Sequence, residues 1–169
     1  DFTPLSSAND IAGKKILVVN MAGFLDFNTK FVADSFEKYG AECRISSINL
    51  PELERLRISP TEMRSTNIAR VLENEKTLEA LILELTGKIS GFDIVALPAV
   101  FGLSSAASVK KLKESLDIPV WLIPTMPPSV PGIRAQQQLR RSFEELGGVY
   151  MLGDTVVKAD FSGNKVQAV

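Results

Sequence analysis

The chain of 169 residues has no histidine and a single cysteine. Without imidazole it cannot form a Ser-His or Cys-His pair, a histidine metal site, or the commonest general base. The lone Cys43 excludes an internal disulfide and is typical of a reducing compartment. Because Cys43 lies in an apolar run that reads as a strand, we expect a buried and inert thiol. The sequence therefore offers no recognisable set of catalytic residues.

Neither sign of charge predominates, since 19 basic residues face 20 acidic ones. This balance argues against binding to a nucleic-acid backbone. The longest nearly apolar run, residues 94–103, is too short to cross a bilayer and contains Pro98. Neither a glycine-rich dinucleotide fingerprint nor a Walker sequence occurs. What is present, 45% apolar residues, is normal for one folded domain.

Short β-branched runs alternate with stretches of helical periodicity. This alternation predicts an α/β fold, with a doubly wound and mostly parallel sheet of four or five strands and helices on both faces, similar to flavodoxin and Rossmann folds. The predicted strands are residues 15–19, 43–48, 92–97 and 118–123.

The predicted helices occupy the intervals between these strands. One helix is capped by Asp26 or Asn28, and another by Ser104 or Ser105. Their apolar positions predict which residues face inward: Phe31, Val32, Phe36 and Tyr39 in the first helix, and Leu139, Phe143 and Leu146 in the last. Further helices are expected over residues 51–58, from Ser59 to about Asn74, and over residues 78–89.

The C-terminal tail departs from the α/β pattern. Three short strands separated by turn residues predict an antiparallel β-meander: Val149–Leu152, Thr155–Asp160 and Lys165–Val169. The chain lacks an initiator Met and stops within the last of these strands, so we expect a piece of a longer protein. The predicted organisation is a lead-in over residues 1–13, an inserted α/β domain over 14–147 and the meander over 148–169.

Ligands of open parallel sheets bind where the strands end. The loops over residues 20–27, 98–105 and 125–134 follow predicted strands, and the last belongs to a stretch with four prolines in nine residues, 124–132. The helix that follows Pro131-Gly132 carries Arg134, Gln136 and Gln137 in its first turn. The helix dipole and a guanidinium would suit an anion there. The alternative is that Arg134 is a solvated surface charge.

A second group of polar residues lies at Arg64, Asn67 and Arg70. On a helix these three side chains share roughly one face, where they could grip a phosphate or a carboxylate. Equally, they could form surface salt bridges with Glu62, Glu73 or Glu75.

Several stretches together resemble the B subunit of the bacterial anaerobic glycerol-3-phosphate dehydrogenase. The most specific is the proline-rich loop with Gly132-Ile133-Arg134. The others lie at residues 14–27, 50–53, 63–72 and 98–103, and in the continuation to 148.

The resemblance implies a longer parent flavoprotein that holds FMN or FAD and oxidises sn-glycerol 3-phosphate to dihydroxyacetone phosphate. The parent would pass electrons to quinone, together with a catalytic A subunit and a membrane-anchoring C subunit. It would be cytoplasmic and peripheral to the inner membrane. This chain resembles the middle, cap-like insert of such a protein, and we expect it to bind no flavin and to be inactive alone.

The resemblance also suggests site residues. Those expected to face the phosphorylated polyol are Arg64, Asn67, Arg70, Phe101, Ser129, Arg134 and Gln137, whereas Val156 and Val157 would approach the adenylate side of a dinucleotide. An alternative function is a non-catalytic module that docks the A and C subunits. A free-standing flavodoxin-like carrier would need a phosphate-cradling first loop, which residues 21–25 do not supply.

Overall fold

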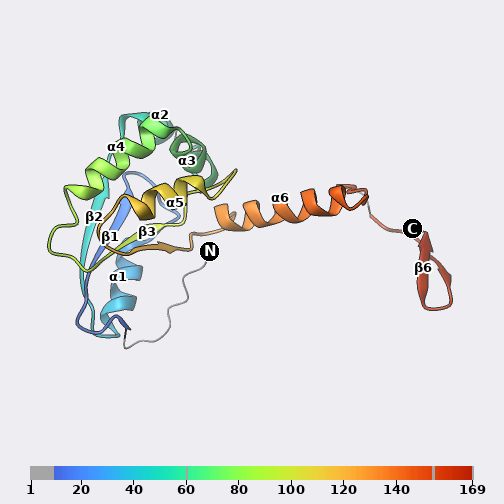
Figure 1. Cartoon of the computed structure of the whole chain (residues 1–169), viewed down its shortest axis with the longest axis horizontal. Coiled ribbons are helices and arrows are strands. Elements are labelled where there is room, and N and C mark those ends of the chain that lie inside the picture. Colours follow the sequence, from blue (N-terminus) through green and yellow to red (C-terminus); the bar gives the residue numbers. More distant parts are fainter. Residues whose placement is uncertain (1–9, 60, 154, 169) are drawn as a thin grey trace. The chain divides into compact units, whose positions relative to one another are not determined.

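The computed structural model describes residues 10–59, 61–153 and 155–168 (Figure 1). Most of the predicted lead-in, residues 1–9, lies outside this range. The chain divides into two compact units, residues 1–135 and 136–169. The first unit therefore ends before residue 147, where the sequence predicts the end of the α/β domain.

The first unit contains a four-stranded parallel sheet in the order β2-β1-β3-β4, which confirms the predicted fold class. β1 and β3 occupy the centre and are almost entirely buried, as expected for strands with a neighbour on each side. Edge strand β2 is largely exposed. The strands span Lys15–Met21 (β1), Glu42–Ile48 (β2), Ile94–Pro98 (β3) and Val120–Ile123 (β4).

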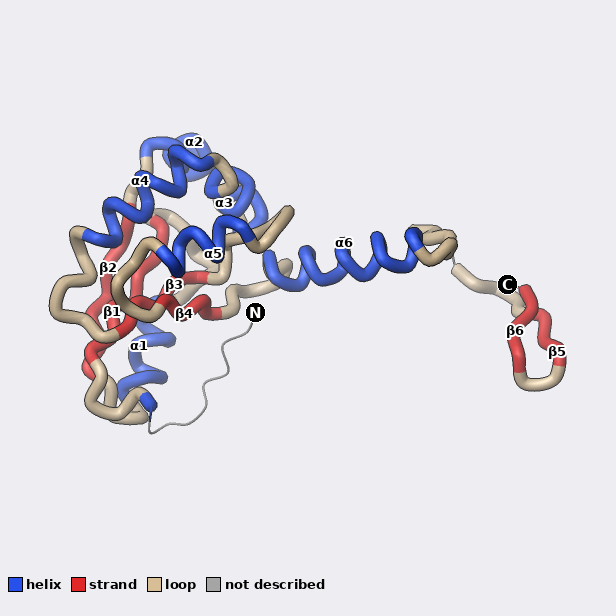
Figure 2. Tube along the Cα trace, viewed as in Figure 1, coloured by secondary structure: helices blue, strands red, loops and turns tan. Residues whose placement is uncertain are grey.

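Five helices of the first unit connect the strands. Because parallel crossovers are right-handed, α1 lies on one face of the sheet, and the crossovers to β3 and β4 place α4 and α5 on the other. Figure 2 shows α4 and α5 side by side and α1 apart from them. The helices span Thr29–Glu37 (α1), Pro51–Ile58 (α2), Ser65–Leu72 (α3), Glu75–Thr86 (α4) and Ala107–Glu114 (α5).

The predicted helix caps are only partly correct. Asn28 caps α1, since its side-chain oxygen accepts a hydrogen bond from the backbone N–H of Phe31 at 3.0 Å. In α5 the N-cap is Ala106 instead of Ser104 or Ser105. Ser105 still accepts a hydrogen bond from the N–H of Ala107 at 3.3 Å, and so satisfies one donor of the first turn.

Two predictions about α1 and α3 are wrong. On α1, Phe36 is buried and packs edge-on against Trp121 of β4, but Phe31 is 71% exposed and Tyr39 is also exposed. The predicted apolar face is wider than the strip that the sheet covers. α3 begins at Ser65 and not at Ser59 as predicted, because Arg64 has extended backbone angles. Met63, before it, is buried in the core. Pro60 lies outside the described residues.

Helix α6, Val130–Glu145, begins in the first unit and ends in the second. The prediction that its later apolar residues face inward is wrong, because Leu139 is 72% exposed, Leu146 is 89% exposed and Phe143 is also exposed. Helical periodicity identifies an apolar face but not a partner for it. Within the described part of the second unit, no element buries this face.

The described tail is an antiparallel hairpin of two strands, β5 (Asp160–Ser162) and β6 (Lys165–Ala168), joined at Gly163 and Asn164. The predicted antiparallel pairing and turn are confirmed. The predicted strand at 149–152 does not form, and residues 155–159 are not in a strand. Asp154 and Val169 lie outside the described range. None of the described helices is both long and apolar enough to cross a bilayer.

Candidate functional site

The strand order reverses between β1 and β3. From β1 the chain moves outward to β2, and it then returns to the other side of β1 to form β3. Open α/β sheets bind ligands at this point, beyond the carboxyl ends of the strands. The three predicted loops follow β1, β3 and β4, so all three lie at this edge of the sheet.

The loop after β1 is joined to the proline-rich loop. The backbone N–H of Met126 donates to the carbonyl oxygen of Asp26 at 3.1 Å. The carboxylate of Asp26 also pairs with Nη1 of Arg64 at 3.2 Å. Within the loop, the Asn20 amide donates to the carbonyl oxygens of Phe24 and Phe27. The loop is therefore fixed from inside and from two neighbouring segments.

The loop after β3 is held from two sides. Nη1 of Arg134 donates to the carbonyl oxygen of Gly102 at 2.9 Å. The carboxylate of Glu73 accepts hydrogen bonds from the N–H of Ser104 at 2.6 Å and from its hydroxyl at 2.8 Å. Gly102 has a φ of 71°, and a Cβ there would lie 2.5 Å from Nη1 of Arg134. Only glycine allows this close approach.

The proline-rich loop rests against the start of α3. Ser65 is 2% exposed, and its hydroxyl donates to the carbonyl oxygen of Pro128 at 2.8 Å. Ser129 accepts a hydrogen bond from the N–H of Gly132 at 3.2 Å, which satisfies a donor in the first turn of α6. Ser129, which was expected to face the substrate, thus makes a capping contact at the start of α6.

A small apolar cluster joins these segments. It contains Ala69 of α3, Leu103 of the loop after β3, and Val130 of α6, with Ile133 packed against it. Arg70 and Arg134 each follow a cluster residue directly in the sequence. The cluster therefore fixes the backbone that carries both guanidinium groups.

The predicted polar residues differ in how far their charges are already neutralised. Arg64 is paired with Asp26, a partner that the sequence did not suggest. Asn67 donates to Glu62 and accepts a hydrogen bond from Nη1 of Arg70 at 2.8 Å. The alternative of salt bridges with Glu62, Glu73 or Glu75 is wrong for both arginines within the described residues. Among the described residues, neither Arg70 nor Arg134 pairs with a carboxylate, so both remain available to an anion.

Four other predicted residues lie elsewhere. The ring of Phe101 is 2% exposed and belongs to the core, so it supports the loop instead of lining an open surface. Gln137 lies in the second unit and is exposed. Val156 and Val157 are exposed residues of the second unit outside any strand.

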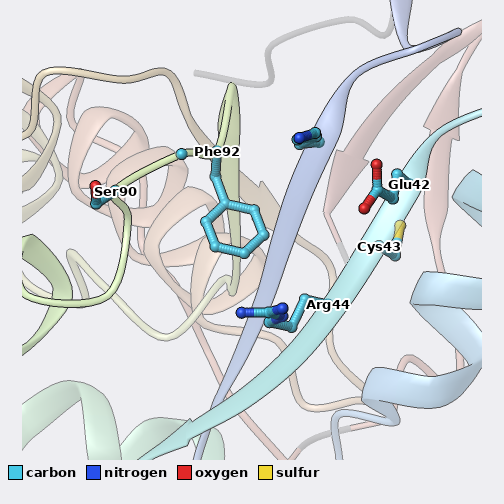
Figure 3. Close-up of a pocket in the computed structure, with 7 residues that line it drawn as sticks. Glu42, Cys43, Arg44, Ser90 and Phe92 are labelled. Carbon is cyan, nitrogen blue, oxygen red and sulfur yellow. The ribbon is translucent and has the colours of Figure 1, made fainter.

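A groove of about 310 Å³ at the opposite, amino edge of the sheet was not predicted. Figure 3 shows Arg44 of β2 beside Phe92. The guanidinium carbon of Arg44 lies 5.8 Å from the centroid of the Phe92 ring. Burial, with a smaller contribution from Glu37, raises the pKa of the Cys43 thiol to about 11. The thiol is thus neutral at physiological pH and is a poor nucleophile. The groove residues come from separate segments without a motif, so no pattern in the sequence could have indicated it.

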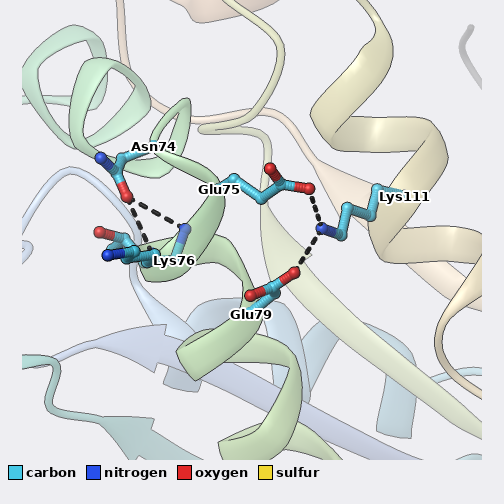
Figure 4. A network of polar contacts seen from close by, with 6 residues as sticks. Asn74, Glu75, Lys76, Glu79 and Lys111 are labelled. Carbon is cyan, nitrogen blue, oxygen red and sulfur yellow. Dashed lines mark hydrogen bonds and ion pairs between the residues drawn. The ribbon is translucent and has the colours of Figure 1, made fainter.

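Lys111 of α5 has a structural role. Lys111 donates to Glu75 at 2.7 Å and to Glu79 at 2.8 Å, which joins α5 to α4 (Figure 4). The hydrogen bond from Lys111 lowers the pKa of Glu75. Asn74 caps the same end of α4 by accepting from the N–H groups of Lys76 and Thr77. This network braces two helices and leaves the carboxyl edge of the sheet as the candidate site.

Comparison with known proteins supports a relationship to flavoproteins. The family described as FAD binding domain matches residues 3–169. The chain belongs to this family. No solved structure matches the chain significantly.

Two curated relatives of this chain carry the same name. The chain is 40% identical over 153 residues to the B subunit of anaerobic glycerol-3-phosphate dehydrogenase from Yersinia enterocolitica. The matched segment covers 90% of this chain and 36% of the relative. The chain is 41% identical over 154 residues to the B subunit from Pectobacterium carotovorum, covering 91% and 37%. The resemblance seen in the sequence is confirmed. The chain spans little more than a third of the length of these relatives.

The first βα turn of the chain does not fit the pyrophosphate of FAD. Such a turn needs several glycines that let the phosphates approach the backbone. Here the turn holds only Gly23, and a Cβ on it would lie 2.8 Å from Cγ of Arg57, whose side chain covers that position. Phe24 and Phe27 fill the turn from the core side. The residues of this turn therefore form no cradle for a dinucleotide.

Proposed function

We propose that this chain is the middle domain of the B subunit of an anaerobic glycerol-3-phosphate dehydrogenase, and that Arg70 and Arg134 bind the phosphate of the substrate. The complete protein would oxidise sn-glycerol 3-phosphate to dihydroxyacetone phosphate and pass electrons to quinone. The contribution of this domain is to hold the phosphate end of the substrate and to exclude water from it.

The observation that carries this proposal is the pair of guanidinium groups that no carboxylate of the described residues neutralises. Both flank the same apolar cluster at the edge where α/β sheets bind ligands. Guanidinium groups bind phosphate through paired, charge-assisted hydrogen bonds. The remaining candidate cation, Arg64, is already neutralised by Asp26 and serves the loop instead.

Substitution of each arginine in the complete natural protein tests the proposal. We expect Arg134→Ala and Arg70→Ala each to raise the KM for glycerol 3-phosphate by about tenfold or more, since a charge-assisted hydrogen bond is lost. Arg55→Ala is the matched control, because Arg55 is an exposed arginine on α2, away from the cluster. Unchanged KM values in both test variants, with folding intact by circular dichroism, would contradict the proposal.

The flavin, FMN or FAD, would be held by residues other than this first βα turn, and the chain alone would bind none and catalyse no turnover. The covered glycine and the aromatic filling of the turn support this inference. Titration of the purified chain with FAD and with FMN, followed by flavin fluorescence, tests it. Quenching that saturates at micromolar flavin would overturn it.

The proposed partners are a catalytic A subunit and a membrane-anchoring C subunit, which would place the protein at the cytoplasmic face of the inner membrane. The names of the relatives support a multi-subunit assembly, because each is called the B component of its dehydrogenase.

A second candidate function is a docking module for these subunits. The exposed apolar face formed by Leu139 and Phe143 of α6, with Leu146 just beyond the end of the helix, supports it. Leu139→Ser combined with Leu146→Ser would then reduce co-purification with the A subunit while leaving the KM for glycerol 3-phosphate unchanged in any complex that still forms. Undiminished co-purification would exclude this face as the docking surface.

A further inference from the structure

Helix α3 presents one row of residues to the loops of the candidate site. Ser65, Ala69 and Glu73 follow one another at intervals of four, so their side chains lie along a single face of the helix and its C-cap. Ser65 bonds Pro128, Ala69 packs in the cluster with Leu103, and Glu73 bonds Ser104.

We propose that Ser65 and Glu73 are positioning residues that fix the proline-rich loop and the loop after β3, and thereby set Arg134 in place for an anionic phosphate group. The inference rests on the proposed function of Arg134. It adds two residues that would not touch the substrate themselves.

The hydrogen bonds of Glu73 are short and charge-assisted, so they hold Ser104 firmly. The Gly102 carbonyl, which accepts the hydrogen bond from Arg134, lies only two residues before Ser104. A shift of this loop therefore moves the acceptor that orients the guanidinium. Ser65 acts at the opposite end, where its buried hydroxyl fixes the carbonyl of Pro128 just before the start of α6.

Removing each contact should weaken binding without removing a ligand group. In the complete natural protein we expect Glu73→Ala to weaken glycerol 3-phosphate binding about fivefold and Ser65→Ala about threefold, because small displacements of a binding group are costly. The measurement is isothermal titration calorimetry, together with KM. Glu84→Ala, which removes an exposed glutamate of α4, is the matched control and should change neither quantity.

Glu73→Gln separates position from charge. Glutamine can accept from the Ser104 N–H and donate to its hydroxyl, so the loop stays in place while a negative charge disappears. Affinity should then stay within about twofold of the wild type or rise, since one repulsive charge is lost. If Glu73 acted only through its charge, Glu73→Ala and Glu73→Gln would both strengthen binding, and the inference would be overturned.

A double-mutant cycle shows whether Glu73 acts through Arg134. In an Arg134→Ala background, we expect Glu73→Ala to change the affinity by less than about twofold, because the group that it positions is absent. An equal loss in both backgrounds would overturn the inference. If Arg134→Ala weakens binding but Glu73→Ala and Ser65→Ala do not, the proposed function stands and this inference fails. If Arg134→Ala itself has no effect, the proposed function fails first.

Discussion

The two units of the chain contain similar apolar residues, but these are buried in the first unit and exposed in the second. In the first unit, apolar residues of the strands and of five helices form one continuous core around the sheet. In the second unit, the large apolar side chains are exposed: Leu139, Phe143, Leu146, Val149, Tyr150, Met151, Leu152, Val156, Val157, Phe161 and Val166. Apolar content and periodicity thus produce burial only where a second layer covers the face.

Local interactions hold the second unit instead. The chain turns at Gly147, which has a φ of 87°, and the N–H of Gly148 donates to the carbonyl of Phe143 at 2.9 Å. Arg140 pairs with Glu144 and stacks on Tyr150, 4.7 Å from the ring centroid. Such contacts define a helix end and a hairpin, but a two-stranded hairpin is marginally stable by itself. The second unit is therefore expected to unfold more easily than the first.

The largest expected effect comes from shortening a leucine in each unit. Leu97 is fully buried in β3, so Leu97→Ala should lower the free energy of unfolding by about 3 kcal/mol. Leu139→Ala removes the same atoms from an exposed site and should change the free energy of unfolding by less than about 0.5 kcal/mol. Urea unfolding followed by circular dichroism measures both. Equal losses would mean that the α6 face is covered in solution.

A smaller effect is expected from two glycines with positive φ. Gly102→Ala should destabilise the chain by about 2 kcal/mol, because a Cβ would strike Arg134 and the Ser105 carbonyl in addition to straining the backbone. Gly153 has a similar φ of 91° but no atom within 4 Å, so Gly153→Ala should cost about 1 kcal/mol or less. Thermal unfolding compares the two variants, and equal shifts in Tm would contradict the crowding around Gly102.

The smallest expected effect concerns Cys43, at the edge of the first core. Its pKa is about 11 in the folded chain and about 9 when exposed, so the unfolded state ionises first as the pH rises. The contribution of Cys43 to the free energy of unfolding should therefore be constant below pH 9 and fall between pH 9 and 11. The rate of iodoacetamide labelling of the folded chain should rise with a midpoint near pH 11. A labelling midpoint near pH 9, the ordinary pKa of a thiol, would show that burial does not raise the pKa of Cys43. Cys43→Ser is the control.

Much of the first unit was predictable because its strands are short, apolar and β-branched. Residues 15–19 and 118–123 lie in or beside β1 and β4, and residues 51–58 coincide with α2. The errors arise where tertiary contacts decide. Met63 packs in the core, and α3 begins only at Ser65. Leu139 is exposed because no described element packs against its side of α6.

The candidate site was predictable only as a set of loops. Prolines, arginines and the positions after the strands indicated where a ligand could bind. The sequence could not indicate which charges neutralise one another, because Arg64 and Asp26 are 38 residues apart and Glu73 and Ser104 are 31 apart. It also could not single out Ser65, because the sequence places this serine inside a helix predicted from Ser59 to about Asn74. Only the fold brings its hydroxyl to Pro128.

We propose that Arg70 and Arg134 together recognise a phosphate at the carboxyl edge of the sheet. The most direct measurement compares the affinity of the complete natural protein for sn-glycerol 3-phosphate and for glycerol, with and without the double substitution Arg70→Ala and Arg134→Ala. We expect the double variant to lose about a hundredfold in affinity for glycerol 3-phosphate and to bind glycerol as the wild type does. Undiminished affinity for glycerol 3-phosphate in the folded double variant would show that these two arginines do not bind the phosphate.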